Sequence, residues 1–352
     1  MIISRTPYRI SFFGGGTDYP DWYLKHGGAV LSSTIDKYCY INCRYLPPFF
    51  EQRIQVVYSK IERCMHYEEI QHPAVRETLR FLNFEHGIEI THVGDLPARS
   101  GTGSSSSFTV GLLNALYALK GEMPNKKQLA DESIHIEQNM INETVGSQDQ
   151  VNAVYGGLNI IRFQDNGEII VNPVTLPYER IKALDANLML FYTGIMRTAE
   201  NVAKSYVDDI EAKTKQLMRM YTMVDEAIEL IANGNLEDFG RLLNDAWQEK
   251  RSLSKIVSNS QVDEIYTSAI DAGALGGKLS GAGGGGFLLL YVPVEKQPDV
   301  KKKLSRLLHV PFSFEPNGSQ IIFHDLHKEY KEEEQSHAEN AHTPFVELTD
   351  IK

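Results

Sequence analysis

Apolar residues follow two different periodicities along the chain, and the change between them falls near Pro177. Before this point most apolar runs are short and rich in β-branched and aromatic residues, which favours strands. The expected strands are residues 2–4, 9–13, 27–45, 53–58, 88–93, 158–163 and 169–176, and helical spacing predicts helices at residues 19–26, 72–84, 108–119 and 127–141.

The pattern after Pro177 is mainly helical. Apolar residues recur at helical spacing from residue 198 to about residue 272, with a break at residues 233–235. Strands are expected at residues 188–193, 287–292, 312–314 and 320–324, and one more helix at residues 296–308. This shift predicts two domains, residues 1–177 and 178–327, followed by a charged, solvated tail at residues 328–352.

The stretch between the strand at 88–93 and the helix at 108–119 consists mainly of residues with small side chains. It contains Gly101 and Gly103, followed by four serines at positions 104–107. Glycines let a backbone approach a ligand closely, and the first N–H groups of a helix attract an anion. We interpret the stretch as a phosphate cradle rather than an ordinary helix cap, because a cap needs only one serine. It is not a Walker A loop, since no Lys-Ser or Lys-Thr follows at the required spacing.

Two further glycine-rich segments leave more than one interpretation open. Residues 14–18, three glycines followed by Thr17 and Asp18, fit a loop that faces a polar ligand. They fit equally well a tight turn in which Asp18 caps the next helix. Residues 281–286 match Gly-x-Gly-x-x-Gly but precede a strand, which excludes a dinucleotide fingerprint and leaves a loop that passes close to a ligand.

The candidate acids lie between the second helix and the following strand. Glu132, Glu137 and Glu143 belong to the predicted helix at 127–141 or its end, and composition does not distinguish a functional glutamate from a solvated one. Asp149 lies in residues 146–150, which interrupt the helical pattern. The segment fits a polar loop, and it fits a loop that presents an acid.

Length, composition and charge narrow the class of protein. The chain has 352 residues, 42% of them apolar and 23% charged, which is typical of a globular protein that can hold two domains. Its 35 basic and 46 acidic residues give a net charge of −11, which disfavours nucleic acid as a partner. No apolar run is long enough to span a membrane, and the three cysteines lack a Cys-x-x-Cys spacing. We therefore expect a reduced, cytoplasmic protein without a nucleic-acid or membrane partner.

Three segments resemble the motifs of the GHMP kinase superfamily, which includes galactokinase, homoserine kinase and mevalonate kinase. Residues 7–19 resemble the first motif, residues 97–108 the second, with Thr102 in place of the usual Leu, and residues 278–285 the third. Each motif is weak alone, but the three in this order are specific, and the resemblance spans residues 2–324. It implies an α+β fold with a ribosomal-protein-S5-like N-terminal domain and a ferredoxin-like C-terminal domain, with the ligands in the cleft between them.

The resemblance implies a catalytic pair. Glu137 and residues 146–150 match the Glu-His…Gly-x-x-Asp-Gln pattern of galactokinase-like members, although Gln138 replaces the histidine. Asp149 would thus be the base or charge-orienting carboxylate, and Arg9 matches the motif-one arginine near the transferred phosphoryl group.

The resemblance also implies ATP and Mg²⁺ as cofactors. Ser105 and Glu137 would hold the Mg²⁺. The residues implied to bind ATP are Pro97, Arg99, Gly101, Thr102, Gly103, Ser104, Ser105, Ser106 and Ser107.

The first motif departs from galactokinase in an informative way. Galactokinases carry Glu and His where this chain has Gly15 and Gly16, so galactose is a doubtful substrate. The Gly-Gly-Gly-Thr-Asp form resembles the D-glycero-D-manno-heptose 7-phosphate kinases and the kinase part of bacterial L-fucokinases. Because the likeness to the heptose kinases extends to residues 192–197, the expected reaction converts heptose 7-phosphate and ATP into the 1,7-bisphosphate and ADP, for nucleotide-activated heptose synthesis.

A phosphorylated sugar needs a cation away from the ATP cradle. Arg197 follows a predicted strand and Gly194 at the start of a predicted helix, where a guanidinium can bind a phosphate with both arms. A surface arginine at a helix start is the alternative, and we favour the phosphate site. The residues expected at the sugar site are Gly15, Gly16, Thr17, Asp18, Gly194, Arg197, Ser280, Gly281 and Gly283.

Two alternative functions also fit the sequence. One is a 1-kinase for L-fucose or another unphosphorylated sugar, which would lack a site for a substrate phosphate. The other is a non-catalytic sugar sensor on the same fold, which the retention of Ser105, Glu137 and Asp149 disfavours. The expected ligands are small molecules, and the protein is expected to be a monomer or a homodimer.

Overall fold

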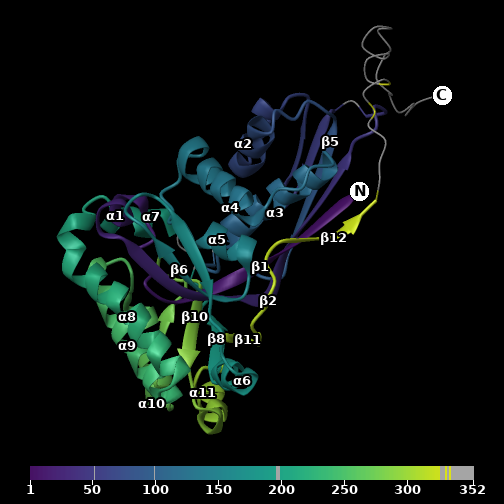
Figure 1. The fold of residues 1–352 in the computed structure, drawn as a ribbon. Coiled ribbons are helices and arrows are strands. Elements are labelled where there is room, and N and C mark those ends of the chain that lie inside the picture. Colours follow the sequence, from purple (N-terminus) through teal and green to yellow (C-terminus); the bar gives the residue numbers. More distant parts are fainter. Residues whose placement is uncertain (51, 99, 196–198, 326–329, 331–332, 334–352) are drawn as a thin grey trace.

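The computed structural model describes residues 1–50, 52–98, 100–195, 199–325, 330 and 333, and it has an α+β fold built on two sheets (Figure 1). The strand order of the larger sheet is β12-β1-β2-β5-β3-β4, and β6 pairs with both β2 and β7. These strands are β1 (Ile2–Phe13), β2 (Gly28–Tyr45), β3 (Ile54–Val57), β4 (Ile61–Cys64), β5 (Ile88–Gly94), β6 (Leu158–Phe163), β7 (Ile169–Pro173) and β12 (Gln320–His324).

Helices of the first half cover one face of the larger sheet (Figure 1). They are α2 (Pro73–Phe81), α3 (Ser104–Leu119), α4 (Lys126–His135), a π-helical turn (Ile136–Met140) and α5 (Gln148–Tyr155). Helix α1 (Pro20–His26) lies apart from them, beside α7 (Ala199–Val207). Helix α3 is buried on nearly every side, because β1 and β2 lie on one side of it and α2, α4 and α5 on the others. Its apolar sequence is that of a central helix, and its N-terminus is held at a fixed point of the sheet.

The smaller sheet has the strand order β11-β8-β10-β9 and lies against the helices of the second half. Its strands are β8 (Leu188–Tyr192), β9 (Gly276–Leu279), β10 (Phe287–Tyr291) and β11 (Leu308–Val310). The helices are α6 (Tyr178–Ala186), α7 (Ala199–Val207), α8 (Thr214–Ala232), α9 (Leu236–Leu253), α10 (Ser260–Asp271) and α11 (Gln297–Lys303). No helix of the described residues is both long and apolar enough to cross a membrane.

The first half confirms most of the expected elements and corrects three of them. Residues 2–13 form one continuous strand, not two, because the register shifts after Pro7 and so accommodates the missing N–H. Helix α3 begins at Ser104, four residues earlier than expected, so the serines belong to its first turn. Asp149 does not lie in a loop: it is the second residue of α5.

The second half contains two elements that the pattern did not predict and lacks one that it did. Strand β9 lies inside the glycine-rich segment, and α6 precedes β8. The strand expected at 312–314 is absent: β11 lies earlier, and Phe314 makes only an isolated bridge to Ile35. The strand at 320–324 forms, but it pairs with β1 of the larger sheet and does not close the smaller one. The expected tail at 328–352 lies outside the described residues apart from 330 and 333.

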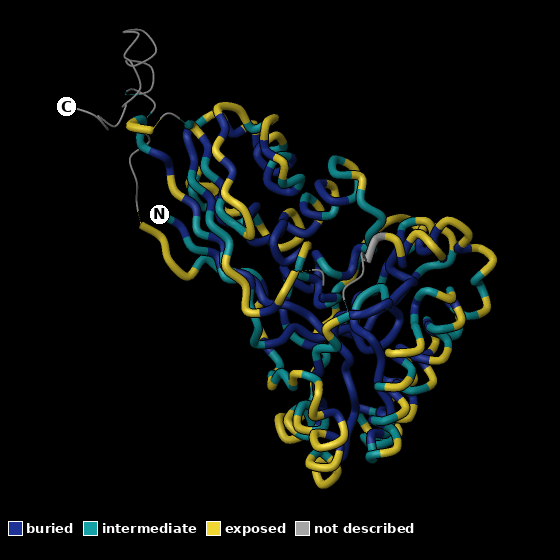
Figure 2. Tube along the Cα trace, turned by 180° about the vertical axis from the view of Figure 1, so that it is seen from behind, coloured by how far each residue is buried: buried dark blue, intermediate teal, exposed yellow. Residues whose placement is uncertain are grey.

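Aromatic side chains join the two sheets behind the site described below. Phe12 and Phe13 at the end of β1 meet Phe239 of α9 edge to face, with ring centroids 5.5 and 5.2 Å apart. Helix α9 also packs unusually close to β9, since a Cβ added at Gly276 would lie 2.0 Å from the carbonyl oxygen of Gly240. The buried core therefore continues from one sheet to the other, as the tube in Figure 2 shows.

Candidate active site

Two glycine-rich loops from distant parts of the chain pack directly on each other at the start of α3. Gly101 and Gly281 both have positive φ angles, +81° and +69°, which other residues rarely adopt. A Cβ added at Gly101 would lie 2.4 Å from the carbonyl oxygen of Ser280, and one added at Gly281 would lie 2.7 Å from the Cα of Gly101. Only glycine therefore fits at this crossing, and the second and third sequence motifs meet there.

The four serines point in different directions because consecutive helical residues are about 100° apart. Ser104 is half-buried and Ser105 is exposed, whereas Ser106 and Ser107 are buried. The Ser107 hydroxyl donates to the carbonyl oxygen of Pro7 at 2.9 Å, so it joins α3 to β1. The exposed half of the run is thus the part that remains free to face a ligand.

The hydroxyl that reaches Glu137 belongs to Ser106, the neighbour of the expected metal ligand Ser105. Ser106 Oγ donates to Glu137 Oε2 at 2.8 Å, and Gln150 Nε2 donates to the same oxygen. Burial raises the pKa of Glu137 to about 7, although these hydrogen bonds favour its charged form. No basic side chain of the described residues lies within salt-bridge distance of Glu137. A buried carboxylate without a protein cation suits a hard metal ion.

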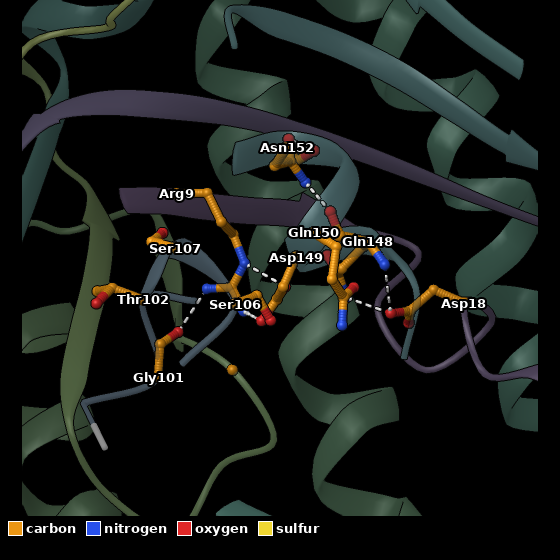
Figure 3. A network of polar contacts seen from close by, with 12 residues as sticks. Arg9, Asp18, Gly101, Thr102, Ser106, Ser107, Gln148, Asp149, Gln150 and Asn152 are labelled. Carbon is orange, nitrogen blue, oxygen red and sulfur yellow. Dashed lines mark hydrogen bonds and ion pairs between the residues drawn. The ribbon is translucent and has the colours of Figure 1, made fainter. Parts of the chain in front are cut away.

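Arg9 and Asp149 form a two-armed ion pair at the centre of the site (Figure 3). Arg9 Nε lies 2.7 Å from Asp149 Oδ1, and Arg9 Nη2 lies 2.6 Å from Oδ2. The third arm, Nη1, donates to the carbonyl oxygen of Gly101 at 2.5 Å. Arg9 is 3% exposed, whereas the Asp149 side chain is 25% exposed, so the carboxylate keeps an open side. Such a carboxylate can orient a hydroxyl or accept its proton.

The loop at residues 14–18 turns its polar side chains into the protein. Thr17 Oγ1 donates to the carbonyl oxygen of Gly14 at 2.8 Å and accepts from the N–H of Ala29 at 3.1 Å. Asp18 is 1% exposed and accepts from the N–H of Gly16 and from Gln148 Nε2, at 2.8 and 2.9 Å. Asp18 does not cap α1, whose N-cap is Tyr19 without a side-chain hydrogen bond. Both side chains expected at the sugar site therefore have partners within the fold.

The other residues expected at the sugar site do not all lie together. Gly15 is buried, and a Cβ added there would lie 3.6 Å from both Ser11 Oγ and Gln148 Nε2. Ser280 and Gly281 belong to the crossing with Gly101, whereas Gly283 packs on Val257 and exposed Gly194 has nothing within 4 Å of its Cβ position. Arg99 and Arg197 lie outside the described residues.

Two buried lysines near the ion pair were missed by the sequence analysis. Lys250 of α9 is 4% exposed and donates to the carbonyl oxygen of Gly281. Lys278 of β9 is 3% exposed and donates to the carbonyl oxygen of Phe12 at 2.9 Å. The signal for Lys250 was its place three residues after Trp247 and three before Leu253, on the apolar face of the helix.

Burial and neighbouring cations act on both lysines. Burial, followed by the positive charge of Arg9, lowers the pKa of Lys250 to about 8, while Asp18 and Asp149 oppose this shift. Burial and the charge of Lys250 lower the pKa of Lys278 well below its usual range. Both lysines therefore lose their protons more easily than exposed lysines do.

A glycine-rich turn at a helix start, beside a carboxylate held by a guanidinium and near two buried lysines, can bind a phosphoryl donor and orient an alcohol. Residues 67–157 match the GHMP kinases N terminal domain, and residues 227–309 match the GHMP kinases C terminal domain. The D-glycero-alpha-D-manno-heptose 7-phosphate kinase of Campylobacter jejuni is 30% identical over 323 residues, 87% of this chain and 93% of that protein. The chain therefore belongs to the GHMP kinases and is an ATP-dependent sugar kinase.

Two other relatives extend the comparison. The L-fucokinase/L-fucose-1-P guanylyltransferase of Bacteroides fragilis is 26% identical over 354 residues, 88% of this chain but only 36% of that protein. The crystal structure of a D-glycero-D-manno-heptose 1-phosphate kinase from Bacteroides thetaiotaomicron has a TM-score of 0.76 at 21% identity, and covers 93% of this chain and 100% of that one. This second likeness shows the fold alone.

Proposed function

We propose that the protein transfers the γ-phosphoryl group of ATP to the anomeric hydroxyl of D-glycero-D-manno-heptose 7-phosphate, giving the 1,7-bisphosphate and ADP. The observation that carries this proposal is the glycine-rich loop at residues 14–18, taken together with 30% identity to the Campylobacter jejuni heptose 7-phosphate kinase. This loop lacks the Glu and His of galactokinases, and the likeness to the heptose kinase extends over nearly the whole chain.

In the proposed reaction Asp149 orients the anomeric hydroxyl and accepts its proton. Its open side leaves room for the sugar, while Arg9 binds both carboxylate oxygens and so fixes the orientation of the group. An anomeric hydroxyl is more acidic than an ordinary alcohol, so a carboxylate is a sufficient base for it. Arg9 also keeps Asp149 close to Gly103, where a Cβ would lie 3.5 Å from the carboxylate.

The nucleotide phosphates would bind at the start of α3. The N–H groups of its first turn have no helical acceptor, and Gly101 and Gly103 allow the backbone to approach the phosphates. Mg²⁺ would neutralise phosphate charge there, held by Glu137 and by a serine hydroxyl, for which both Ser105 and Ser106 are candidates. The buried Glu137 carboxylate, joined to Ser106 at 2.8 Å, fits such an ion.

The division into domains at residue 177 also stays a proposal. It agrees with the start of α6 at Tyr178, although β12 returns to the larger sheet. We likewise propose that the protein is a monomer or a homodimer and that it is located in the cytoplasm.

The test is a coupled ADP-release assay with heptose 7-phosphate, mannose, fucose and galactose as acceptors. We expect the highest kcat/KM with heptose 7-phosphate, and a 1,7-bisphosphate as the product. Preference for L-fucose would favour the alternative of a 1-kinase for an unphosphorylated sugar. The 26% identity to the Bacteroides fragilis protein supports that alternative. Binding of a sugar without any ADP release would favour the non-catalytic sensor. Equal turnover of phosphorylated and unphosphorylated sugars would contradict a site for the substrate phosphate.

A further inference from the structure

The two buried lysines are held by backbone carbonyls and not by carboxylates. Neither Lys250 nor Lys278 has an acidic side chain within salt-bridge distance in the described part of the chain. An ammonium group has three N–H donors and is costly to bury without an anion. Burying such a group lowers stability unless the amine loses its proton or a ligand supplies the missing charge.

Lys250 is linked to the reacting groups through the crossing of the two glycine-rich loops, and it interacts electrostatically with Arg9 and Asp149. Its Nζ donates to the carbonyl oxygen of Gly281, and Gly281 packs on Gly101. The carbonyl oxygen of Gly101 accepts from Arg9, which holds Asp149. Two hydrogen bonds and one backbone contact therefore connect the Lys250 ammonium to the Arg9 guanidinium.

The charged groups around the crossing of Gly101 and Gly281 do not balance one another. Burial lowers the pKa of Lys278 of β9 and raises the pKa of Asp18, so both favour their neutral forms. Arg9 of β1 and Lys250 of α9 then face a single carboxylate, Asp149 of α5. Both carboxylates already have partners, Arg9 for Asp149 and Gln148 for Asp18. The excess positive charge attracts an anion to the place where the open side of Asp149 would hold the acceptor hydroxyl.

We propose that Lys250 is a catalytic residue whose ammonium group binds the phosphoryl group while it passes from ATP to the sugar. The proposal rests on the sugar-kinase activity and holds for any acceptor sugar. As the phosphoryl group leaves ADP, its charge spreads over three equatorial oxygens, and a fixed cation there stabilises the transition state more than the bound substrates. The bond to the ADP oxygen breaks, the bond to the sugar oxygen forms, and Asp149 receives the hydroxyl proton.

The first experiment compares Lys250→Met with the wild type and with Lys255→Met, which removes an exposed lysine just beyond the same helix. Removing one fixed transition-state contact costs about 10²- to 10³-fold in kcat, and we expect that loss for Lys250→Met with every accepted sugar. Binding of ADP alone should stay within about twofold, whereas the tighter complex of ADP with aluminium fluoride and sugar should be lost. Lys255→Met should match the wild type. Since wild-type turnover is measured alongside, a wrong acceptor sugar and a wrong role for Lys250 are separate results.

The second experiment uses pH and Lys250→Arg. Because the pKa of Lys250 is about 8, its ammonium loses the proton as pH rises through that value, and kcat/KM of the wild type should fall there. Arginine stays charged, so Lys250→Arg should keep measurable activity and lose this alkaline limb. The pH profile of Lys250→Arg still tests the proposal if Lys250→Met fails to fold.

Three outcomes would overturn the proposal. The first is near-normal kcat in Lys250→Met. The second is a loss confined to phosphorylated sugars, which would assign Lys250 to the phosphate of the substrate instead. The third is an alkaline limb that is unchanged in Lys250→Arg.

Discussion

The loops at residues 14–18 and 101–107 have similar compositions and opposite orientations. Both combine glycines at positive φ with hydroxyl-bearing residues. In the first loop Thr17 and Asp18 are fully engaged by backbone groups and by Gln148, and both are buried. In the second loop Ser105 is exposed at the start of a long helix. The same kinds of residue therefore hold the fold together in one place and remain available to a ligand in the other.

This difference separates two consequences of substitution. Changes on the ligand-facing side should lower turnover and leave the melting temperature nearly unchanged. Loss of the inward-facing Thr17 hydroxyl should lower stability and leave the turnover of the folded fraction nearly unchanged. The expected effects on turnover below run from the largest to the smallest.

Asp149→Asn tests the ligand-facing side most strongly. The amide can neither accept the hydroxyl proton nor pair fully with Arg9, so kcat should fall by roughly 10³- to 10⁴-fold. The affinity for ATP should stay nearly intact, because the nucleotide binds at the start of α3. Steady-state kinetics and nucleotide titration provide the measurement. Near-normal turnover would remove Asp149 from the mechanism.

Gly103→Ala tests how closely the cradle must fit the ion pair. The added Cβ would lie 3.2 Å from Arg9 Cγ and strain a backbone with φ +72°, so kcat should fall by about 10²-fold as the pair shifts. Gly121→Ala is the matched control, because Gly121 has φ +74° and nothing within 4 Å of its Cβ position. Both variants should lose similar stability, about 1–2 kcal/mol. Equal kinetics in the two would show that the contact with Arg9 is unimportant.

Glu137→Gln tests the proposed magnesium site. Losing a carboxylate charge should raise the Mg²⁺ concentration for half-maximal activity by about tenfold, with smaller shifts for Ser105→Ala and Ser106→Ala. Comparing the two serine variants decides which hydroxyl contributes, since Ser106 is the one that contacts Glu137. If all three variants gave the same Mg²⁺ titration as the wild type, nucleotide and water alone would hold the metal.

Thr17→Val should have the smallest effect on turnover and the clearest effect on stability. It keeps the shape of the side chain but leaves the buried N–H of Ala29 without its hydroxyl acceptor. The free energy of unfolding should fall by about 1–3 kcal/mol, while kcat per folded molecule stays within about twofold. Thr267→Val, at an exposed position of α10, is the control. A large loss of kcat without a loss of stability would reverse the comparison, because it would assign Thr17 to the ligand.

The sequence predicted the elements of this fold better than it predicted the directions of side chains. Strand and helix periodicity found α3, β2 and β5, because each is long and strongly patterned. Arg9 and Asp149 are 140 positions apart, and only the resemblance to a family connected them. Their direct pairing depends on tertiary packing that no local pattern encodes.

The remaining differences have specific physical causes. One residue of helical rotation decides that Ser106 and not Ser105 reaches Glu137. Asp18 turns inward because Gln148, 130 positions away, offers it a hydrogen bond. Lys250 escaped notice because a lysine on an apolar helix face counts as an interruption of the pattern until its surroundings are known.

The pairing of β12 with β1 has a consequence for how the protein is made. Ile2 and His324 are partners in the larger sheet, so one edge of β1 stays open until His324 has left the ribosome. At about 5–20 residues per second this interval lasts on the order of tens of seconds. During it the nascent chain exposes the N–H and C=O groups of a strand edge, which is the kind of surface that pairs with other chains.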